Sequence, residues 1–296
     1  MNVLRNHLTH VLAVIIVSIW GTTFVSTKVL MNAGLQPSDI FFVRFLLAYI
    51  CIIPFSYKHL WARNVKDEFL LLLTGVMGGS LYFLTENIAL KYSYCSNVSL
   101  LVCSTPMLTT LILGMFYRDE RINLRQFICS LAALSGMALV VLNGHFVLKL
   151  SPKGDLLALA AALTWALYSL LMRVFNGRYS MLFITRKIFF YGLLTIIPVF
   201  CVWPLNTDWA LYARPVVWGN LLFLGVVASF LCYFGWNYVM YKLGVVRSTN
   251  YIYLNPVVTL LTSYLCLDER ITPLALAGAV MILGGIYFVE LFRKRK

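Results

Sequence analysis

Residues 105–122 read TPMLTTLILGMFYRDERI, and residues 255–271 read NPVVTLLTSYLCLDERI. Each stretch places a proline, Pro106 or Pro256, inside a long apolar run, and each ends in the same Asp-Glu-Arg-Ile tag. The two prolines are 150 residues apart (256 minus 106) in a chain of 296 residues. A spacing of half the chain indicates that one structural unit occurs twice. Because both copies are apolar runs of about 20 residues, both are expected to lie in a membrane.

The composition supports a membrane protein. Hydrophobic residues make up 61% of the chain and charged residues only 12%, and the mean hydropathy is +0.83. Soluble domains carry roughly 25% charged residues. The apolar runs are Leu8–Leu30, Asp39–Phe55, Phe69–Leu90, Cys95–Phe116, Leu124–Leu142, Asp155–Phe175, Leu182–Trp203, Val216–Met240, Ser248–Leu267 and Leu274–Phe292. Since lipid offers backbone groups no water partner, these runs predict an all-α integral membrane protein with ten transmembrane helices.

Ten helices in two copies give five helices per copy. Five is odd, so the two copies must cross the membrane in opposite directions. The expected repeats are residues 1–148 and 149–296. Asn87 aligns with Asn237 at the proline offset, and Trp20 aligns with Trp165 at an offset of 145 residues (165 minus 20). Inverted repeats with a binding site at their interface, near the bilayer midplane, are the architecture of secondary transporters.

The net charge of +13 reports topology rather than a nucleic-acid partner. With ten spans, 17 of the 24 Lys and Arg residues fall on the side of the N-terminus. Cytoplasmic loops carry the excess of Lys and Arg in membrane proteins. We therefore expect both termini in the cytoplasm, and a multi-pass protein of the bacterial inner (plasma) membrane in contact with anionic lipid head groups.

Pro106 and Pro256 are expected to kink the fourth and ninth helices. A proline inside a helix removes one backbone hydrogen bond and pushes on the preceding turn. The carbonyl groups of Val102 and Ile252, four residues earlier, would then be free to bind water or a polar solute. The alternative is that both prolines only shape helix packing, since membrane helices tolerate proline well.

These features resemble the drug/metabolite transporter superfamily, of EamA type. The motifs that carry the resemblance are Trp20-Gly21-Thr22-Thr23-Phe24, Arg44-Phe45-Leu46-Leu47-Ala48, Asp119-Glu120-Arg121, Asp268-Glu269-Arg270 and Gly278…Gly284-Gly285. They cover essentially the whole chain. The resemblance implies ten helices and a central cavity formed by spans one to four and six to nine. It also implies export of small metabolites, amino acids or toxic compounds, coupled to a proton or ion gradient.

Glu86 is an acidic residue well inside a predicted span. An ionised carboxylate in hydrocarbon costs at least about 2–3 kcal/mol, so it should face a cavity or a partner. Arg44 enters its own helix from the same side at a similar depth, which predicts an ion pair between Arg44 and Glu86. Either this pair fixes helix positions, or Glu86 binds a substrate ammonium or takes up a proton, or its side chain extends to the membrane interface.

Matched amides and deep aromatic rings complete the expected site. Buried amides are costly to leave unpaired, so Asn87 and Asn237 should point inward, toward neighbouring helices or toward a ligand. Deep aromatic side chains could form an apolar wall that also attracts cations, and packing is the alternative for each ring. The predicted substrate-binding residues are Trp20, Tyr82, Glu86, Asn87, Trp165, Trp236 and Asn237.

The sequence predicts no enzyme, no cofactor and no metal site. The seven cysteines are scattered through apolar runs without metal-ligand spacing, and no phosphate-binding loop is present. The predicted function is therefore secondary transport of small metabolites, amino acids or drug-like compounds, as an exporter working by alternating access. The alternative is a polytopic membrane sensor or assembly protein that does not transport. The fifth and tenth spans are either outer scaffold or a homodimer face.

Overall fold

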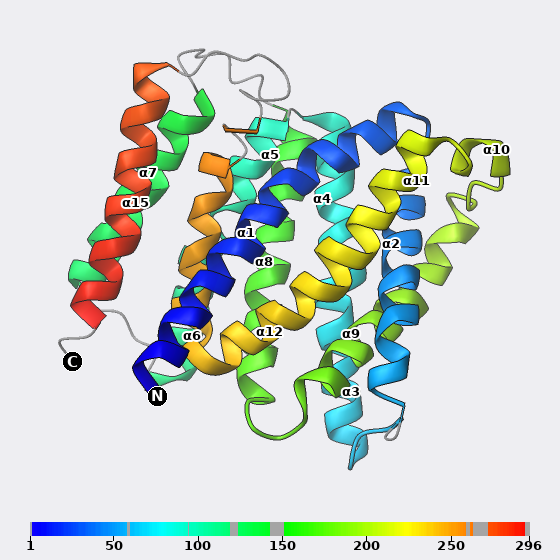
Figure 1. Ribbon diagram of the computed structural model, residues 1–296, viewed down its shortest axis with the longest axis horizontal. Helices are drawn as coiled ribbons and strands as arrows, with labels where there is room; N and C mark the ends of the chain where they lie inside the picture. The colour runs from blue at the N-terminus through cyan, green and yellow to red at the C-terminus, as the bar shows by residue number, and fades with distance from the viewer. Residues whose placement is uncertain are drawn as a thin grey trace.

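The computed structural model describes residues 2–57, 60–93, 95–118, 124–142, 151–258, 261–262 and 272–293. The regular elements in these ranges are all helical (Figure 1). They are α1 (Asn2–Asn32), α2 (Pro37–Ile52), η1 (Ile53–Phe55), α3 (Val65–Gly75), η2 (Val76–Ser80), α4 (Leu81–Tyr92), α5 (Cys95–Val102), α6 (Thr105–Phe116), α7 (Leu124–Leu142), α8 (Pro152–Val174), α9 (Met181–Ile196), η4 (Ile197–Cys201), α10 (Trp209–Tyr212), α11 (Pro215–Leu222), η5 (Phe223–Leu231), α12 (Cys232–Leu243), α13 (Val245–Thr249), η6 (Asn250–Leu254) and α15 (Pro273–Arg293).

The fold class predicted from the sequence is confirmed as an all-α membrane protein. Within the described residues, seven helical segments are long and apolar enough to cross a bilayer. They are His7–Asn32, Pro37–Phe55, Val65–Tyr92, Val98–Phe116, Pro152–Val174, Met181–Cys201 and Pro215–Leu243. Two shorter apolar helices, Phe127–Leu139 and Leu276–Phe288, lie within α7 and α15. The total of ten stays a prediction, since the ninth expected span and both Asp-Glu-Arg tags lie partly or wholly outside the described residues.

The two halves of the chain run in opposite directions. We call the face where α1 begins and α15 ends the terminal face, and the opposite one the far face (Figure 1). The helix α1 starts at the terminal face, whereas α8 starts at the far face. There the hydroxyl of Ser93, just after α4, lies 3.4 Å from Asp155 Oδ1 in the first turn of α8. This is the antiparallel relation expected of an inverted repeat.

Two long helices contain matched π-helical segments. The third span runs through η2 between α3 and α4, and the eighth runs through η5 between α11 and α12. Residues 76–80, shifted by 150, fall at 226–230 and so inside η5. A π-helical turn offsets the i→i−4 ladder and frees carbonyl groups, which is why such turns are frequent at functional sites.

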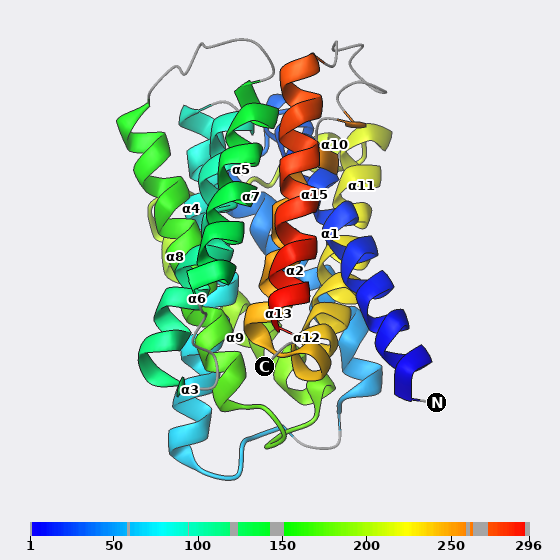
Figure 2. The same cartoon turned by 90° about the vertical axis from the view of Figure 1, so that its left-hand side faces the viewer.

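The helices α7 and α15 form a pair at one side of the bundle. Figure 2 shows them side by side in front of the other helices. Glycines let the two backbones approach, as small residues do in membranes, where no hydrophobic force drives helices together. A Cβ atom built on Gly136 would lie 2.7 Å from the carbonyl oxygen of Gly278. The pair therefore depends on residues without side chains at the crossing.

We expect Gly285→Ala to destabilise this pair. The added methyl would lie 2.8 Å from the Cβ of Ala133 and 2.8 Å from the carbonyl oxygen of Cys129. Overpacking of this kind costs about 1–3 kcal/mol, so the melting temperature of the purified protein should fall by a few degrees. Gly284→Ala is the matched control, because no atom lies within 4 Å of its Cβ position. Equal melting temperatures for the two variants would contradict this account of the packing.

Candidate functional site

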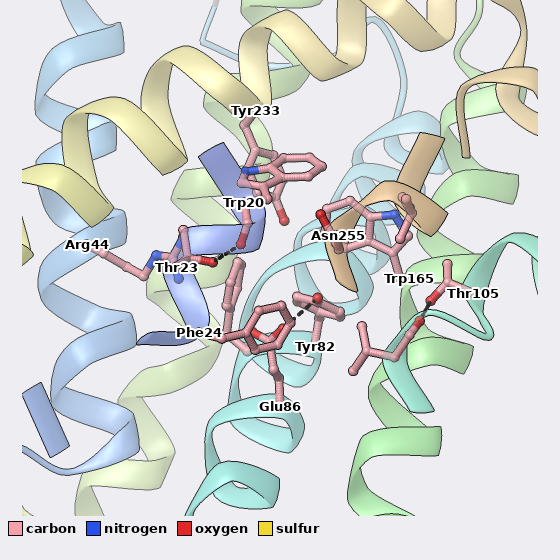
Figure 3. Close-up of a pocket in the computed structure, with 13 residues that line it drawn as sticks. Trp20, Thr23, Phe24, Arg44, Tyr82, Glu86, Thr105, Trp165, Tyr233 and Asn255 are labelled. Atoms are coloured by element: carbon pink, nitrogen blue, oxygen red, sulfur yellow. Dashed lines mark hydrogen bonds between the residues drawn. The ribbon is translucent and has the colours of Figure 1, made fainter. Parts of the chain in front are cut away.

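A pocket lies inside the bundle, between the two halves of the chain (Figure 3). It contains about 470 Å³ of space free of protein atoms, part of which is open to the surface. The lining residues are Trp20, Thr23, Phe24, Arg44, Tyr82, Phe83, Glu86, Val102, Thr105, Trp165, Tyr233, Ile252 and Asn255. They come from α1, α2, α4, α5, α6, α8, α12 and η6, and from the helical turn at 255–258. Both halves therefore contribute walls to one cavity.

Many of the lining residues lie at positions that are related by the internal repeat. The related pairs are Phe83 with Tyr233, Val102 with Ile252, and Thr105 with Asn255, each 150 residues apart, and Trp20 with Trp165, 145 apart. Glu86 breaks this symmetry. Position 236, which matches Glu86 at the 150-residue offset, is a tryptophan. The otherwise pseudo-symmetric lining thus carries a carboxylate from one half only.

Glu86 and Arg44 bring opposite charges into the pocket. Both are buried, with relative exposures of 8% and 2%. Glu86 Oε1 accepts a hydrogen bond of 2.8 Å from the hydroxyl of Tyr82, one turn earlier on α4. Arg44 donates from Nε to Ser229 Oγ at 2.9 Å, and its guanidinium lies 4.2 Å from the ring centroid of Phe83. These contacts hold each charged group in place without a direct contact between them, so the Arg44–Glu86 ion pair stays a prediction.

Aromatic rings pack edge to face around the pocket. Trp20 and Trp165 meet with centroids 5.4 Å apart and planes at 88°. Tyr82 also packs against Trp165, with ring centroids 4.7 Å apart and planes tilted at 55°. The indole Nε1 of Trp165 is buried and has no hydrogen-bond partner among the described residues. A buried donor without a partner costs free energy, and a polar atom of a bound solute would satisfy it.

The matched π-helical segments each hold one pocket ring. Trp20 Nε1 donates to the carbonyl oxygen of Ala228 in η5 at 3.0 Å. The hydroxyl of Tyr233 donates to the carbonyl oxygen of Gly78 in η2. Gly78 and Ala228 are themselves 150 residues apart. The freed backbone groups of both halves therefore position aromatic side chains in the same way.

The two proline-containing segments are interrupted at the pocket. Cys103 and Ser104 separate α5 from α6, which begins one residue before Pro106, and the 3-10 segment η6 directly precedes the turn that contains Pro256. The carbonyl oxygen of Val102 accepts a hydrogen bond from the Thr105 hydroxyl at 2.6 Å. The carbonyl oxygen of Ile252 lies 3.6 Å from the Cys103 thiol, a weak donor. Val102 thus ends α5 and Ile252 lies in a 3-10 segment, and both residues line the pocket.

Four of the seven predicted binding residues line the pocket, namely Trp20, Tyr82, Glu86 and Trp165. The amide of Asn87 donates instead to the carbonyl oxygen of Pro37 at 3.3 Å.

Asn237 and Trp236 also lie outside this pocket. Asn237 accepts from the Tyr168 hydroxyl and donates to Thr185 Oγ1 at 2.8 Å. Trp236 is fully buried behind Trp20, with ring centroids 5.1 Å apart. Asn87 and Asn237 each lie one helical turn after a lining residue, Phe83 or Tyr233, on the same helix face. They are therefore displaced along the helix axis from the pocket: Asn87 reaches the backbone of α2, and Asn237 lines a different cavity.

The prediction of binding residues missed several lining positions. Thr105 and Asn255 each precede a proline that the sequence singles out, and Phe83 and Tyr233 occupy matched positions on the third and eighth spans. The repeat offset was therefore the signal that could have identified them. Applied to the deep aromatic residues, this offset pairs Phe83 with Tyr233, and both rings line the pocket.

Comparisons with known proteins agree on a transporter. The profile of the EamA-like transporter family matches residues 7–142 and again residues 152–291. A protein from Escherichia coli named "Probable amino-acid metabolite efflux pump" is 28% identical over 286 residues, which cover 94% of this chain and 93% of that protein. A protein from Streptantibioticus cattleyicolor named "Probable terminal-alkyne amino-acid exporter" is 26% identical, over 94% of this chain and 91% of that protein.

Two further comparisons extend the similarity. An "Uncharacterized transporter" from Archaeoglobus fulgidus is 25% identical over 95% of this chain and 97% of that protein. A solved crystal structure aligns with a TM-score of 0.75 over 96% of this chain and 98% of that chain, at 18% identity, and so shares the fold. The family profile matches once in each half of the chain, and the two matches together cover nearly the full length, in step with the repeat seen in the helices. The chain belongs to the EamA-like transporter family.

Proposed function

We propose that this protein is a secondary carrier that exports amino acids and similar zwitterionic metabolites by alternating access. The observation that carries the proposal is the pocket between the halves, which holds one buried carboxylate, Glu86, and one buried guanidinium, Arg44, between aromatic walls. Two relatives carry names of amino-acid exporters, which supports the same solute class.

The pocket chemistry complements an α-amino acid. A carboxylate favours the solute ammonium group, and a guanidinium favours the solute carboxylate through charge-assisted hydrogen bonds. The rings of Trp20, Tyr82 and Trp165 offer apolar surface for the solute side chain, and their faces also attract cations. In this proposal the free Nε1 of Trp165 supplies a further hydrogen bond to the solute.

The direction of insertion follows from charge. The terminal face carries most of the Lys and Arg residues in the predicted topology, so we place it in the cytoplasm and the far face outside the bacterial inner membrane. The pocket residues act in solute binding rather than in bond making or breaking, so the proposal includes no enzymatic step. The gradient that drives export is expected to be that of protons or another ion.

The proposal is tested with purified protein in liposomes. We expect counterflow of labelled L-phenylalanine, inhibited by other large amino acids. Two analogues of matched size each lack one charged end: 2-phenylethylamine lacks the carboxylate and 3-phenylpropionate lacks the ammonium. Each should compete at least tenfold more weakly, because a hydrogen bond to a charged group contributes about 1.5–3 kcal/mol and 1.4 kcal/mol is a factor of ten.

Three results would contradict parts of the proposal. If both analogues competed as strongly as unlabelled L-phenylalanine, the assignment of Arg44 and Glu86 to the two ends of the solute would be wrong. Absence of flux for any amino acid would remove the solute class. Saturable binding without flux would indicate a sensor rather than a carrier.

A further inference from the structure

A polar cluster joins the two halves at the terminal face, far along the bundle from the pocket. Its acidic members, Asp67 and Glu68, lie in the first turn of α3. Its other members belong to the second half, around the turn between α8 and α9 and on α9 itself: Arg178, Tyr179, Lys187 and Tyr191. We call these six residues the terminal-face latch. Their contacts span more than a hundred residues of sequence.

Glu68 and Lys187 form the centre of the latch. Glu68 Oε1 accepts hydrogen bonds from Lys187 Nζ and from the Tyr191 hydroxyl. Its Oε2 accepts from the backbone N–H of Ala62 at 2.6 Å. The Lys187 side chain is 3% exposed, and its ammonium lies 4.4 Å from the ring centroid of Trp61. A buried ammonium needs a counter-charge, so Lys187 holds Glu68 strongly.

The outer edge of the latch is weaker. The Tyr179 hydroxyl donates to Asp67 Oδ2 at 2.7 Å, and Arg178 Nη1 lies 3.6 Å from Asp67 Oδ1. The Arg178 side chain is 55% exposed, and exposed ion pairs contribute little. The latch therefore depends mainly on Glu68 and Lys187, with Asp67 as a secondary contact.

Arg186, next to Lys187, binds the segment between η1 and α3. It is buried, and its guanidinium donates to the carbonyl oxygens of Ser56 and Leu60, the second at 3.2 Å. Two adjacent basic residues of α9 thus hold the segment that connects η1 with α3. Arg186 aligns with Arg44 at an offset of 142 residues (186 minus 44). The inversion of the repeat places the two equivalent arginines toward opposite faces.

A second cavity lies between the pocket and the terminal face. It is lined by Met172, Asn176 and Met181 around the α8–α9 turn, and by Asn237, Met240, Tyr241 and Val245 of α12 and α13. Asn237 and the Tyr168 hydroxyl close the space between this cavity and the pocket rings, since Tyr168 also packs 5.0 Å from Trp165. A solute that reaches the pocket from the terminal face must pass this layer. The α8–α9 turn, which the latch holds, borders that path.

We propose that the terminal-face latch is the cytoplasmic gate of the carrier. While Glu68 and Lys187 are in contact, the α8–α9 turn stays against α3 and the passage from the second cavity to the pocket, past Asn237 and Tyr168, stays closed. Loading of an exported solute requires this contact to break. This inference rests on the proposed transport function, because a gate presupposes a transported solute. Opening of the gate can nevertheless be measured without any solute.

The test measures cysteine accessibility. The reporter is Met240→Cys, at a buried wall of the second cavity, in a chain whose native cysteines are replaced. A membrane-impermeant maleimide is added at the terminal face of oriented vesicles. We expect Glu68→Gln and Lys187→Met to speed labelling about tenfold, which corresponds to about 1.4 kcal/mol. The charge swap Glu68→Lys with Lys187→Glu should return labelling toward the parent rate.

Control variants distinguish a gate from a contact that only stabilises the fold. Asp208→Asn makes the same acid-to-amide change at the exposed cap of α10, outside the latch, and should leave labelling unchanged. Tyr191→Phe removes one hydrogen bond to Glu68 and should give an intermediate rate, which keeps the test informative if Glu68→Gln does not fold. A lower melting temperature without faster labelling would overturn the gate. Loss of the proposed solute transport alone would not, since labelling needs no solute.

Discussion

Glu86→Gln is expected to reduce transport by about two orders of magnitude while the protein stays folded. The glutamine keeps the length of the side chain, and its amide oxygen can still accept the hydrogen bond from Tyr82. It cannot carry the negative charge that the proposal assigns to binding of the solute ammonium. A hydrogen bond to a charged group contributes up to about 3 kcal/mol, which is about two orders of magnitude in affinity. The measurement is flux of labelled amino acid in liposomes that contain equal amounts of each variant.

Two transport assays distinguish the roles that Glu86 can have. If Glu86 binds the solute ammonium, Glu86→Gln loses both counterflow and gradient-driven transport. If Glu86 carries the coupling proton, counterflow persists and only the acceleration by a pH gradient disappears. Asp208→Asn is the control for the chemical change, because that carboxylate caps α10 and does not line the pocket. Normal rates for Glu86→Gln in both assays would exclude Glu86 from transport.

The fold class could be predicted from the sequence because the length and hydrophobicity of the apolar runs determine it. Apolar runs of bilayer length dictate helices, and the spacing of Pro106 and Pro256 reveals the repeat. The π-helical segments η2 and η5 were not predicted. They contain ordinary apolar sequence, and the ring hydrogen bonds from Trp20 and Tyr233 that accompany them come from distant helices.

The candidate site was only partly predictable. A charge in the membrane must face a cavity or a partner, so Glu86 was found from its depth alone. Trp20 and Trp165 were found as deep aromatic residues at matched positions of the repeat. The direction in which Asn87 points depends on the rotation of α4 about its axis, which packing against α2 decides. The Glu68–Lys187 contact was not predicted at all. Its two residues are 119 positions apart and lie near helix ends, where charged residues are common and carry no specific signal.

Arg44→Gln is expected to be the most damaging single change in the pocket. It leaves Glu86 as a buried carboxylate whose one hydrogen-bond donor within the described structure is Tyr82. For the predicted Arg44–Glu86 ion pair, removal of one partner costs about 3–5 kcal/mol, so both the melting temperature and transport should fall. The substitution also removes the contacts of Arg44 with Ser229 and Phe83, and Ser229→Ala measures the first of these separately.

The double variant Arg44→Gln/Glu86→Gln isolates the interaction between the two charges. With both charges removed, no buried ion lacks a partner, so most of the lost stability should return, whereas transport should stay as low as in the single variants. Non-additivity of this kind is the signature of two residues that act on each other. If the double variant melts no higher than Arg44→Gln, the two charges do not stabilise each other. Arg44 would then act on the folded protein only through Ser229 and Phe83, and the predicted ion pair would be wrong.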